Sequence, residues 1–221
     1  MTNRTTLRMR FALARTYFRC RNLLRTEMGF PTYTRGTTEM IRTRTDPVRH
    51  ATIALAIERI QKERIPGAFA EVGVFRGTLS AFLHKQAPYR RLFLFDTFAG
   101  FPDRDHDLRF RNTSVDLVKT RIGNLDNVEF RIGIFPQTAA GLESETFSLV
   151  CFDADTYQAA VDSLAFFYPR IPKGGYCFMH DYNSPDYERG VQRATDAFLQ
   201  DRPEKPIELP DVWGSVVFRK A

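Results

Sequence analysis

The turn that decides the fold of this chain reads AEVGVFRG over residues 70–77, where an apolar run meets two glycines. The apolar run predicts a buried strand over 68–74, and the residues after the turn predict a helix over 77–86. Gly73 leaves out a Cβ where the backbone must pass close to a ligand, and Gly77 allows the turn into the helix. In sheets built from such units, ligands bind at the carboxyl ends of the strands.

The alternation of strand and helix continues through the rest of the chain. After a helix over 47–64 and the first strand, the pattern predicts strands over 91–96, 128–132, 147–153, 174–180, 206–209 and 213–219. It predicts further helices over 114–122, 157–168 and 186–200. Because the strands are apolar on both faces, helices must cover both sides of the sheet. We therefore expect an α/β fold, a doubly wound, mostly parallel, seven-stranded sheet in one domain, residues 47–221.

Positive charge is concentrated at the start of the chain. The net charge is +6, and residues 1–26 hold seven arginines with no acid before Glu27. Apolar spacing predicts an amphipathic helix over 4–25 within a basic helical arm and connection, residues 1–46. Two readings stay open: the arm packs on the domain or on a second subunit of a homo-oligomer, or it contacts an anionic membrane surface. No nucleic-acid-binding module accompanies the arginines, so nucleic acid is not an expected partner.

The apolar and cysteine content is that of an ordinary globular protein. The chain is 43% apolar and has 20 Phe against one Trp, so we expect a largely aromatic core. The spacing of Cys20, Cys151 and Cys177 fits neither a zinc site nor a disulfide framework, and Cys151 and Cys177 lie in apolar runs. No apolar run reaches the ~18–20 residues that span a bilayer. These features predict a cytoplasmic protein in a reducing compartment.

The spacing of the two glycines favours a nucleoside ligand without phosphates. The turn has Gly-x-x-x-Gly and lacks the middle glycine that admits a pyrophosphate, which disfavours an NAD-dependent oxidoreductase. Asp96 ends the second strand, 25 residues after Glu71, where an acid can accept hydrogen bonds from both ribose hydroxyls. That role is shared by dinucleotide and S-adenosylmethionine folds, so Asp96 alone does not separate them.

A second polar group follows two later strands. Asp153 ends one strand, and His180 and Asp181 end the next, so all three should converge at one edge of the sheet. Together they could hold a divalent metal, or serve as a general base on a substrate hydroxyl. The alternative is that the acids cap helices and the histidine makes structural hydrogen bonds. The charged stretch 103–112, with His106, is either a loop that closes over the substrate or a solvated loop.

Four stretches in order resemble the motifs of the macrocin O-methyltransferase family, the metal-dependent sugar O-methyltransferases of antibiotic biosynthesis. They are IPGAFAEVGVFRG (65–77), FDTFAGFP (95–102), GIFPQT (133–138) and DADTY (153–157). The resemblance runs from about Ile65 to Tyr182. It implies a Rossmann-like methyltransferase sheet with S-adenosylmethionine as cofactor.

The resemblance also implies roles for individual residues. The methionine and ribose part of the cofactor would be lined by Glu71, Gly73, Val74 and Gly77. The ribose hydroxyls would be held by Asp96, followed by Thr97, and the adenine would lie near Ser114, Gly133 and Phe135.

In the family, the first Asp of Asp-x-Asp-x-Tyr and an Asp-Asp-Tyr triplet bind magnesium. Asp153 matches the first, but the triplet here reads His180-Asp181-Tyr182, at the same 27-residue separation. Histidine is a poor magnesium ligand and a better ligand for transition metals. Three readings stay open: a metal, magnesium or a transition metal, held by Asp153, His180 and Asp181; a lost metal; or His180 as the catalytic base beside Asp153.

The expected activity is therefore methyl transfer from S-adenosylmethionine to a hydroxyl of a sugar or another small polar metabolite. The alternatives are a catechol-like or lipid-linked acceptor, and an inactive nucleotide-binding module.

Overall fold

A computed structural model describes residues 41, 46–101 and 110–221. The chain divides into two compact units, residues 1–42 and 43–221, and the fold below is that of the second unit. The expected basic arm, except for residues 41 and 46, lies outside the described residues, and so does most of the charged stretch with His106. Among the described residues, no helix combines the length and apolarity needed to cross a bilayer.

A seven-stranded sheet forms the centre of this unit, as the sequence predicts. Its strands are β1 (Ala68–Val72), β2 (Leu92–Asp96), β3 (Val128–Ile132), β4 (Phe147–Phe152), β5 (Tyr176–Met179), β6 (Ile207–Leu209) and β7 (Ser215–Arg219). The strand order is β3-β2-β1-β4-β5-β7-β6. Strands β1 to β5 pair in parallel, whereas β7 is antiparallel to both β5 and β6.

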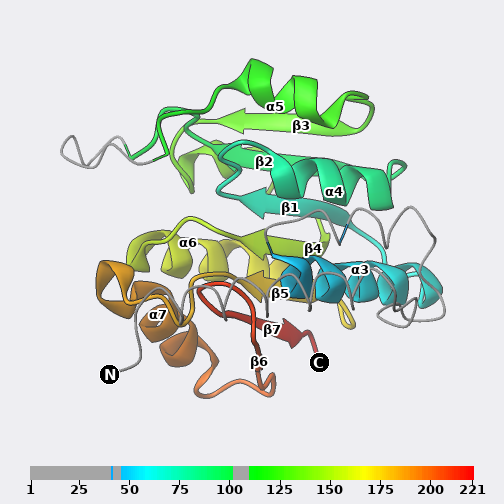
Figure 1. The fold of residues 1–221 in the computed structure, drawn as a ribbon. Helices are drawn as coiled ribbons and strands as arrows, with labels where there is room; N and C mark the ends of the chain where they lie inside the picture. The colour runs from blue at the N-terminus through cyan, green and yellow to red at the C-terminus, as the bar shows by residue number, and fades with distance from the viewer. Residues whose placement is uncertain (1–40, 42–45, 102–109) are drawn as a thin grey trace, which may run out of the picture. The chain divides into compact units, whose positions relative to one another are not determined.

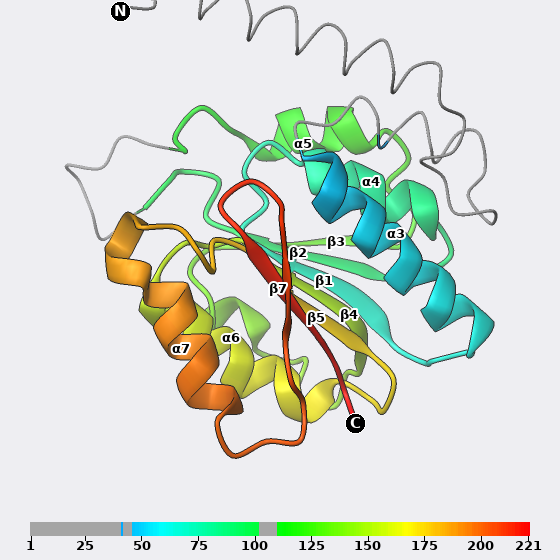
Figure 2. The same cartoon turned by 60° about the horizontal axis from the view of Figure 1, so that its bottom comes forward.

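Helices cover both faces of the sheet (Figures 1 and 2). One face carries α3 (Pro47–Lys62), α4 (Thr78–Gln86) and α5 (Val115–Ile122), and the other carries α6 (Tyr157–Phe167) and α7 (Gly190–Leu199). Short 3-10 turns lie at Gln137–Ala139, Tyr168–Arg170 and Asp186–Arg189. The last of these occupies the start of the expected helix 186–200, where the backbone of Tyr187 and Glu188 is left-handed. The α-helix therefore begins only at Gly190.

Local capping explains where several helices begin. The side chain of Asp46 accepts a hydrogen bond from the Arg49 amide at the start of α3, and Pro47 occupies the first turn. Ser114 and Thr156 cap α5 and α6 in the same way. Ser114, expected near the adenine, thus has a structural role at the start of α5.

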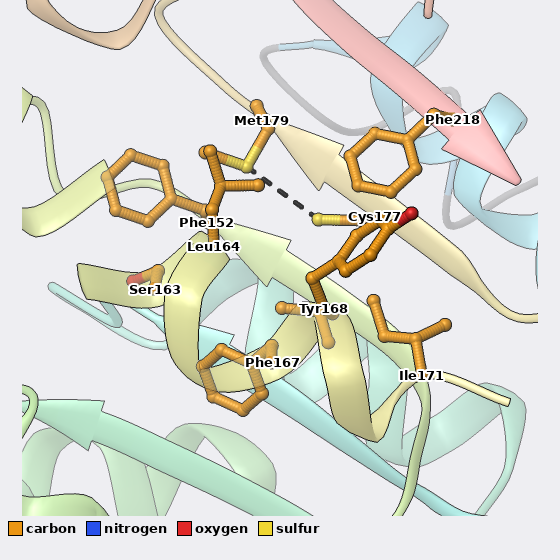
Figure 3. A pocket seen from close by; sticks show the side chains of 10 residues that line it. Phe152, Ser163, Leu164, Phe167, Tyr168, Ile171, Cys177, Met179 and Phe218 are labelled. Carbon is orange, nitrogen blue, oxygen red and sulfur yellow. Dashed lines mark hydrogen bonds between the residues drawn. The ribbon is translucent and has the colours of Figure 1, made fainter. Parts of the chain in front are cut away.

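The core is largely aromatic, as the composition predicts. Phe147 lies edge-to-face with Phe167 at 4.9 Å between ring centroids, and Phe95 lies edge-to-face with Phe167 at 5.8 Å. Figure 3 shows the neighbouring layer, in which Cys177 Sγ lies 3.7 Å from Met179 Sδ. The side chains there leave no space for a water-sized ligand. This layer is core, and Cys151 and Cys177 are free and buried.

Candidate active site

The parallel strands end at one edge of the sheet, and the polar residues singled out by the sequence gather there. The strand order reverses between β1 and β4, because β1 leads by way of α4 to β2, whereas β4 leads by way of α6 to β5. Such a reversal opens a crevice at the carboxyl ends of the two central strands. The turns that follow β1 and β4 carry Gly73 and Asp153.

Gly73 lets these two turns touch. Its φ is +88°, and a Cβ placed there would lie 2.0 Å from the carbonyl oxygen of Asp153. The turns are also tied to their neighbours, since the Gly73 amide donates to Phe95 O and the Asp153 amide donates to Val72 O. The backbone that passes close to Gly73 in this structure is therefore that of Asp153. The glycine brings the predicted cofactor turn directly against the polar cluster.

Gly77 has a comparable packing role one turn later. It begins α4 with φ +71°, and an added Cβ would lie 2.6 Å from Val118 Cγ1. A side chain at this position would push α5 away from the turn.

Asp96 holds the glycine turn in place. Its Oδ2 accepts hydrogen bonds from the amides of Val74 at 2.7 Å and Phe75 at 2.8 Å, and its Oδ1 accepts one from Phe98 at 2.6 Å. A carboxylate offers about four acceptor positions, so most of its capacity is taken by backbone. A ribose hydroxyl bound at Asp96 would use the acceptor capacity that the backbone amides leave free. Thr97 stabilises the same loop by donating from Oγ1 to Gly100 O.

Glu71 is buried between β1 and α4, and its side chain has a partner in the helix. Ser80 Oγ donates to Glu71 Oε2 at 2.6 Å. Burial raises the pKa of Glu71 well above its ordinary value, and the hydrogen bond from Ser80 offsets only part of this effect. Burial and the Ser80 hydrogen bond thus act on this carboxyl group in opposite directions, and burial has the larger effect.

The remaining expected adenine neighbours lie beyond β3. Gly133 directly follows that strand, and its amide donates to Asp96 O at 2.9 Å. Phe135 packs on the core, stacked on Phe167 at 5.5 Å and edge-to-face with Phe95 at 5.4 Å. Phe135 thus serves core packing in this structure, and its contact with adenine stays a prediction.

Asp153, His180 and Asp181 converge as their positions after parallel strands predict. His180 Nδ1 lies 2.9 Å from Asp153 Oδ1 and 3.2 Å from Asp181 Oδ2. On its other side, His180 Nε2 lies 3.0 Å from the carbonyl oxygen of Val212, in the β6–β7 connection. A carbonyl oxygen can only accept, so Nε2 must carry a proton.

The charges around the ring favour the imidazolium. Burial lowers the pKa of His180, but the charge of Asp153 and hydrogen bonds to Asp153 and Asp181 outweigh burial and raise this pKa to about 10. Burial alone would raise the pKa of Asp153, but His180 and Arg49 hold it below its usual range. In this arrangement the ring is a cation with both nitrogens donating.

Asp155 belongs to the same cluster, although no separate role was predicted for it from its motif. Burial, followed by the charges of Asp181 and Asp153, raises its pKa to about 8. Its backbone is left-handed, with φ +59°. The Asp-x-Asp spacing was the signal that could have identified it.

Arg49 is the residue that sequence reasoning missed entirely. It lies in the first turn of α3, and its Nη1 is 2.7 Å from Asp153 Oδ2, which is 104 positions away in the chain. Its Nε lies 3.5 Å from Asp46 Oδ2, so the guanidinium spans two acids. Nothing in the sequence of the helix distinguishes Arg49 from an exposed arginine such as Arg59.

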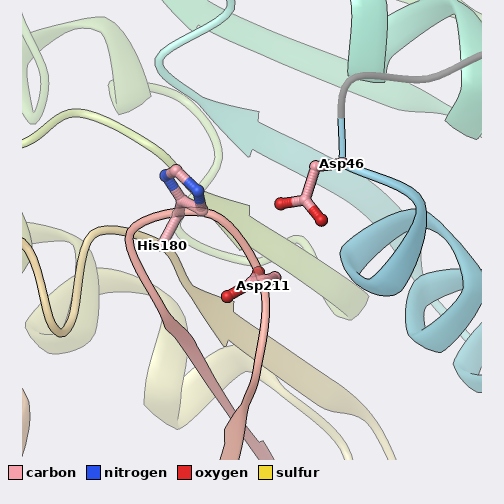
Figure 4. A group of neighbouring side chains, drawn as sticks. All are labelled: Asp46, His180 and Asp211. Atoms are coloured by element: carbon pink, nitrogen blue, oxygen red, sulfur yellow. The ribbon is translucent and has the colours of Figure 1, made fainter. Parts of the chain in front are cut away.

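A further acidic pair lies on the far side of His180. Figure 4 shows Asp46, from the start of α3, and Asp211, from the β6–β7 connection, beside the imidazole. Burial raises the pKa of Asp211, although hydrogen bonds from Ser215 oppose this effect. His180 is thus surrounded by carboxyl groups from four parts of the chain: the start of α3, the turns after β4 and β5, and the β6–β7 connection.

The expected metal ligands can be tested against this arrangement. Asp153, His180 and Asp181 offer ligand atoms within 4.8 Å of one another. Magnesium prefers oxygen ligands, but one of these donors is an imidazole whose two nitrogens both face acceptors. A transition metal would need the lone pair of His180 Nδ1, but Nδ1 already faces Asp153 Oδ1. The other oxygen of Asp153 already faces Arg49. The donor set as it stands does not fit magnesium.

Several known proteins resemble this chain. The sequence profile of the family described as Macrocin-O-methyltransferase (TylF) matches residues 31–220. Mycinamicin III 3''-O-methyltransferase of Micromonospora griseorubida is 30% identical, over 63% of this chain and 65% of that protein. The 8-demethyl-8-(2,3-dimethoxy-alpha-L-rhamnosyl)-tetracenomycin-C 4'-O-methyltransferase of Streptomyces olivaceus is 29% identical, over 57% of each. This chain therefore spans less than two thirds of these relatives.

One solved structure matches a larger part of this chain than these two relatives do. The O-methyltransferase NovP matches with a TM-score of 0.65 and 25% identity, covering 77% of this chain and 78% of its own.

Proposed function

This chain belongs to the macrocin O-methyltransferase family, and from that premise we propose that it transfers a methyl group from S-adenosylmethionine to a sugar hydroxyl. The observation that carries the proposal is the contact between Gly73 and the Asp153 backbone. It sets the nucleoside turn, held by Asp96, directly beside a polar cluster that can bind a hydroxyl. A donor bound at the turn and an acceptor bound at the cluster would lie next to each other.

The proposed reaction needs positioning more than activation. The acceptor oxygen attacks the methyl carbon, a C–O bond forms, the C–S bond breaks with its electron pair left on sulfur, and S-adenosylhomocysteine leaves. Because the sulfonium is already an activated donor, alignment of the two reactants supplies much of the rate. The hydroxyl proton passes to the carboxyl groups around His180. Asp155 suits a general base, because its pKa of about 8 lies near the working pH.

Cofactor binding and methyl transfer are tested separately. Titration calorimetry with S-adenosylhomocysteine should show binding, and no binding at ~100 μM would contradict the proposal, since metabolite sites saturate near physiological levels. Methylation of nucleotide sugars and glycosides is then followed by mass spectrometry. Asp155→Asn, which removes the proposed general base, should lower turnover by about 10²-fold or more. The matched control is Asp162→Asn on α6, whose partner is Gln158 in the same helix.

The sugar acceptor rests on the relatives, since the names of two of them specify methylation at a numbered sugar-type position. A catechol-like or lipid-linked acceptor is the competing proposal, favoured by the arginines of residues 1–26. Deleting residues 1–26 should weaken binding to anionic liposomes if that segment contacts a membrane. Unchanged binding would remove the lipid-linked alternative.

We also propose a homo-oligomer in a reducing, cytoplasmic setting. The free, buried Cys151 and Cys177 support the reducing setting. Light scattering after size-exclusion chromatography measures the oligomer, and a monomer across a tenfold concentration range would contradict it.

A further inference from the structure

The charge balance of the polar cluster is the least expected feature of this fold. Asp153 has two oxygens, and each faces a nitrogen of the protein: Oδ2 faces Arg49 Nη1 at 2.7 Å, and Oδ1 faces His180 Nδ1 at 2.9 Å. Asp153 is half-buried, with 28% of its side chain exposed, and a carboxylate withdrawn from water to this degree is stabilised by a nearby positive charge, from a side-chain cation or from a metal ion. Here the protein itself supplies it.

Arg49 is held in this position from two sides. Asp46 accepts a hydrogen bond from the Arg49 backbone amide at 3.2 Å, and its Oδ2 pairs with Nε of the same residue at 3.5 Å. The side chain of Arg49 is only 15% exposed. An arginine keeps its charge at every pH at which the protein is folded. The guanidinium is thus a permanent charge, oriented toward Asp153 by the cap of α3.

A divalent ion at Asp153 would have to overcome this arrangement. It would either displace the guanidinium, leaving it with Asp46 as its one remaining acid among the described ion pairs, or share the carboxylate with it at close range against charge repulsion. His180, which follows β5, is a second obstacle to binding of a divalent ion. His180 directs Nε2 to Val212 O and Nδ1 to two carboxylates, so both ring nitrogens face acceptors.

We infer that the guanidinium of Arg49 takes the place of a divalent metal ion at Asp153, so this chain works without one. The inference concerns the charge of the site and rests on the proposed function only where turnover is measured. Arg49 is a positioning residue: it fixes the Asp153 carboxylate, which in turn orients the acceptor. The ring of His180, whose two nitrogens both face acceptor oxygens, stands at the position where the family has an oxygen ligand.

Ion binding to the protein alone tests the inference without any turnover assay. Titration calorimetry and thermal unfolding are run with Mg²⁺ or Mn²⁺ at about 5 mM, above the dissociation constants of weak protein sites. The wild-type protein should show no heat of binding and no shift in melting temperature. In the double variant R49M/H180D, which removes the guanidinium and the imidazole beside Asp153, addition of Mg²⁺ or Mn²⁺ should raise the melting temperature. Saturable Mg²⁺ or Mn²⁺ binding by the wild-type protein below about 1 mM would overturn the inference.

Single variants isolate the role of Arg49. R49M should lower turnover at least tenfold and should show Mn²⁺ binding by calorimetry, whereas R49K, which retains the charge, should keep part of the turnover and bind no ion. The matched control is R59M on the same helix, because Arg59 is exposed and pairs only with Glu63 among the described ion pairs. If R49M is indistinguishable from R59M in turnover and ion binding, the inference is wrong. If R49M does not fold, R49K is compared with the wild-type protein instead. Full turnover together with Mn²⁺ binding in R49K would overturn the inference.

Two results separate this inference from the proposed function. Chelation by EDTA should leave wild-type turnover unchanged. If EDTA abolishes turnover and Mg²⁺ or Mn²⁺ restores it, the inference is overturned, but methyl transfer is supported. A failure to bind S-adenosylhomocysteine would instead contradict the proposed function and leave the ion-binding results standing.

Discussion

The substitution Gly73→Ala tests the contact that joins the two halves of the site. Residue 73 has φ +88°, and alanine in this left-handed region costs about 1–2 kcal/mol. The new Cβ would also lie 2.0 Å from the Asp153 carbonyl oxygen and 2.5 Å from its carbonyl carbon. These are backbone atoms of a central turn, so relieving the overlap adds about 1–3 kcal/mol. The expected loss in the free energy of unfolding is about 2–5 kcal/mol.

Gly141→Ala is the matched control for this measurement. Gly141 has nearly the same φ, +83°, but nothing lies within 4 Å of an added Cβ. Both variants lose the same unfolded-state entropy, so that contribution cancels in the comparison. The difference between them therefore measures the overlap with Asp153 alone.

Urea unfolding followed by circular dichroism gives the two free energies of unfolding. In thermal unfolding, the melting temperature should fall by roughly 2–4 °C for each kcal/mol lost in a domain of this size. Gly73→Ala should also weaken binding of S-adenosylhomocysteine, because the turn and Asp153 must move apart. If the two alanine variants differ by less than about 0.5 kcal/mol, the reasoning about this contact is refuted.

Three further predictions concern other parts of the fold. Asp96→Asn should weaken binding of S-adenosylhomocysteine at least tenfold and lower stability by about 1–3 kcal/mol, because three backbone amides lose a charged acceptor; unchanged calorimetry and unfolding would contradict this. Burial raises the pKa of Glu204, but hydrogen bonds from Tyr168 and Lys220 outweigh it and lower the pKa to about 2. Because the folded pKa lies below the unfolded value of about 4.3, the stabilisation is present above that value and is lost as pH falls toward 2. Glu204→Gln should therefore destabilise by about 1.5–3 kcal/mol at pH 7 and by progressively less below pH 4, and a deficit that does not depend on pH would exclude the ionic origin. Trp213, the single tryptophan, is 54% exposed and follows Val212, the carbonyl partner of His180. Its fluorescence should change when an acceptor binds at the cluster, and an unchanged emission spectrum at saturating acceptor would place the acceptor elsewhere.

The convergence of the polar residues was predictable because of a simple geometric rule. The carboxyl ends of parallel strands share one edge, so residues that follow β4 and β5 must lie near each other. Asp153 and His180 could be placed together on this basis alone. The rule does not assign partners, however: Nδ1 of the imidazole faces Asp153 and Asp181, whereas Nε2 faces the carbonyl oxygen of Val212, which no motif contains.

Other residues show where local reasoning stops. The sequence predicts that the backbone at Gly73 passes close to a ligand, which stays a prediction; the group that approaches Gly73 in this structure is the Asp153 backbone, which the sequence could not name. Phe135 lies in a recognisable motif, yet its ring packs on Phe167, because an aromatic side chain beside a core is buried wherever space allows. The strand pairing of β5 with β7, antiparallel at the end of a parallel sheet, also depends on packing rather than on pattern.

The amino-acid sequence by itself determined the kinds of element, their order and the edge at which the site forms. Periodicity, capping residues and turn glycines act over a few positions, so they can be read directly from the chain. Only the tertiary structure decided the charges at the Asp153 carboxylate. Arg49 reaches Asp153 across 104 positions because α3 packs on the sheet beside the β4 turn, and no local pattern encodes that contact. The identity of the cation at Asp153 is therefore a property of the packed fold.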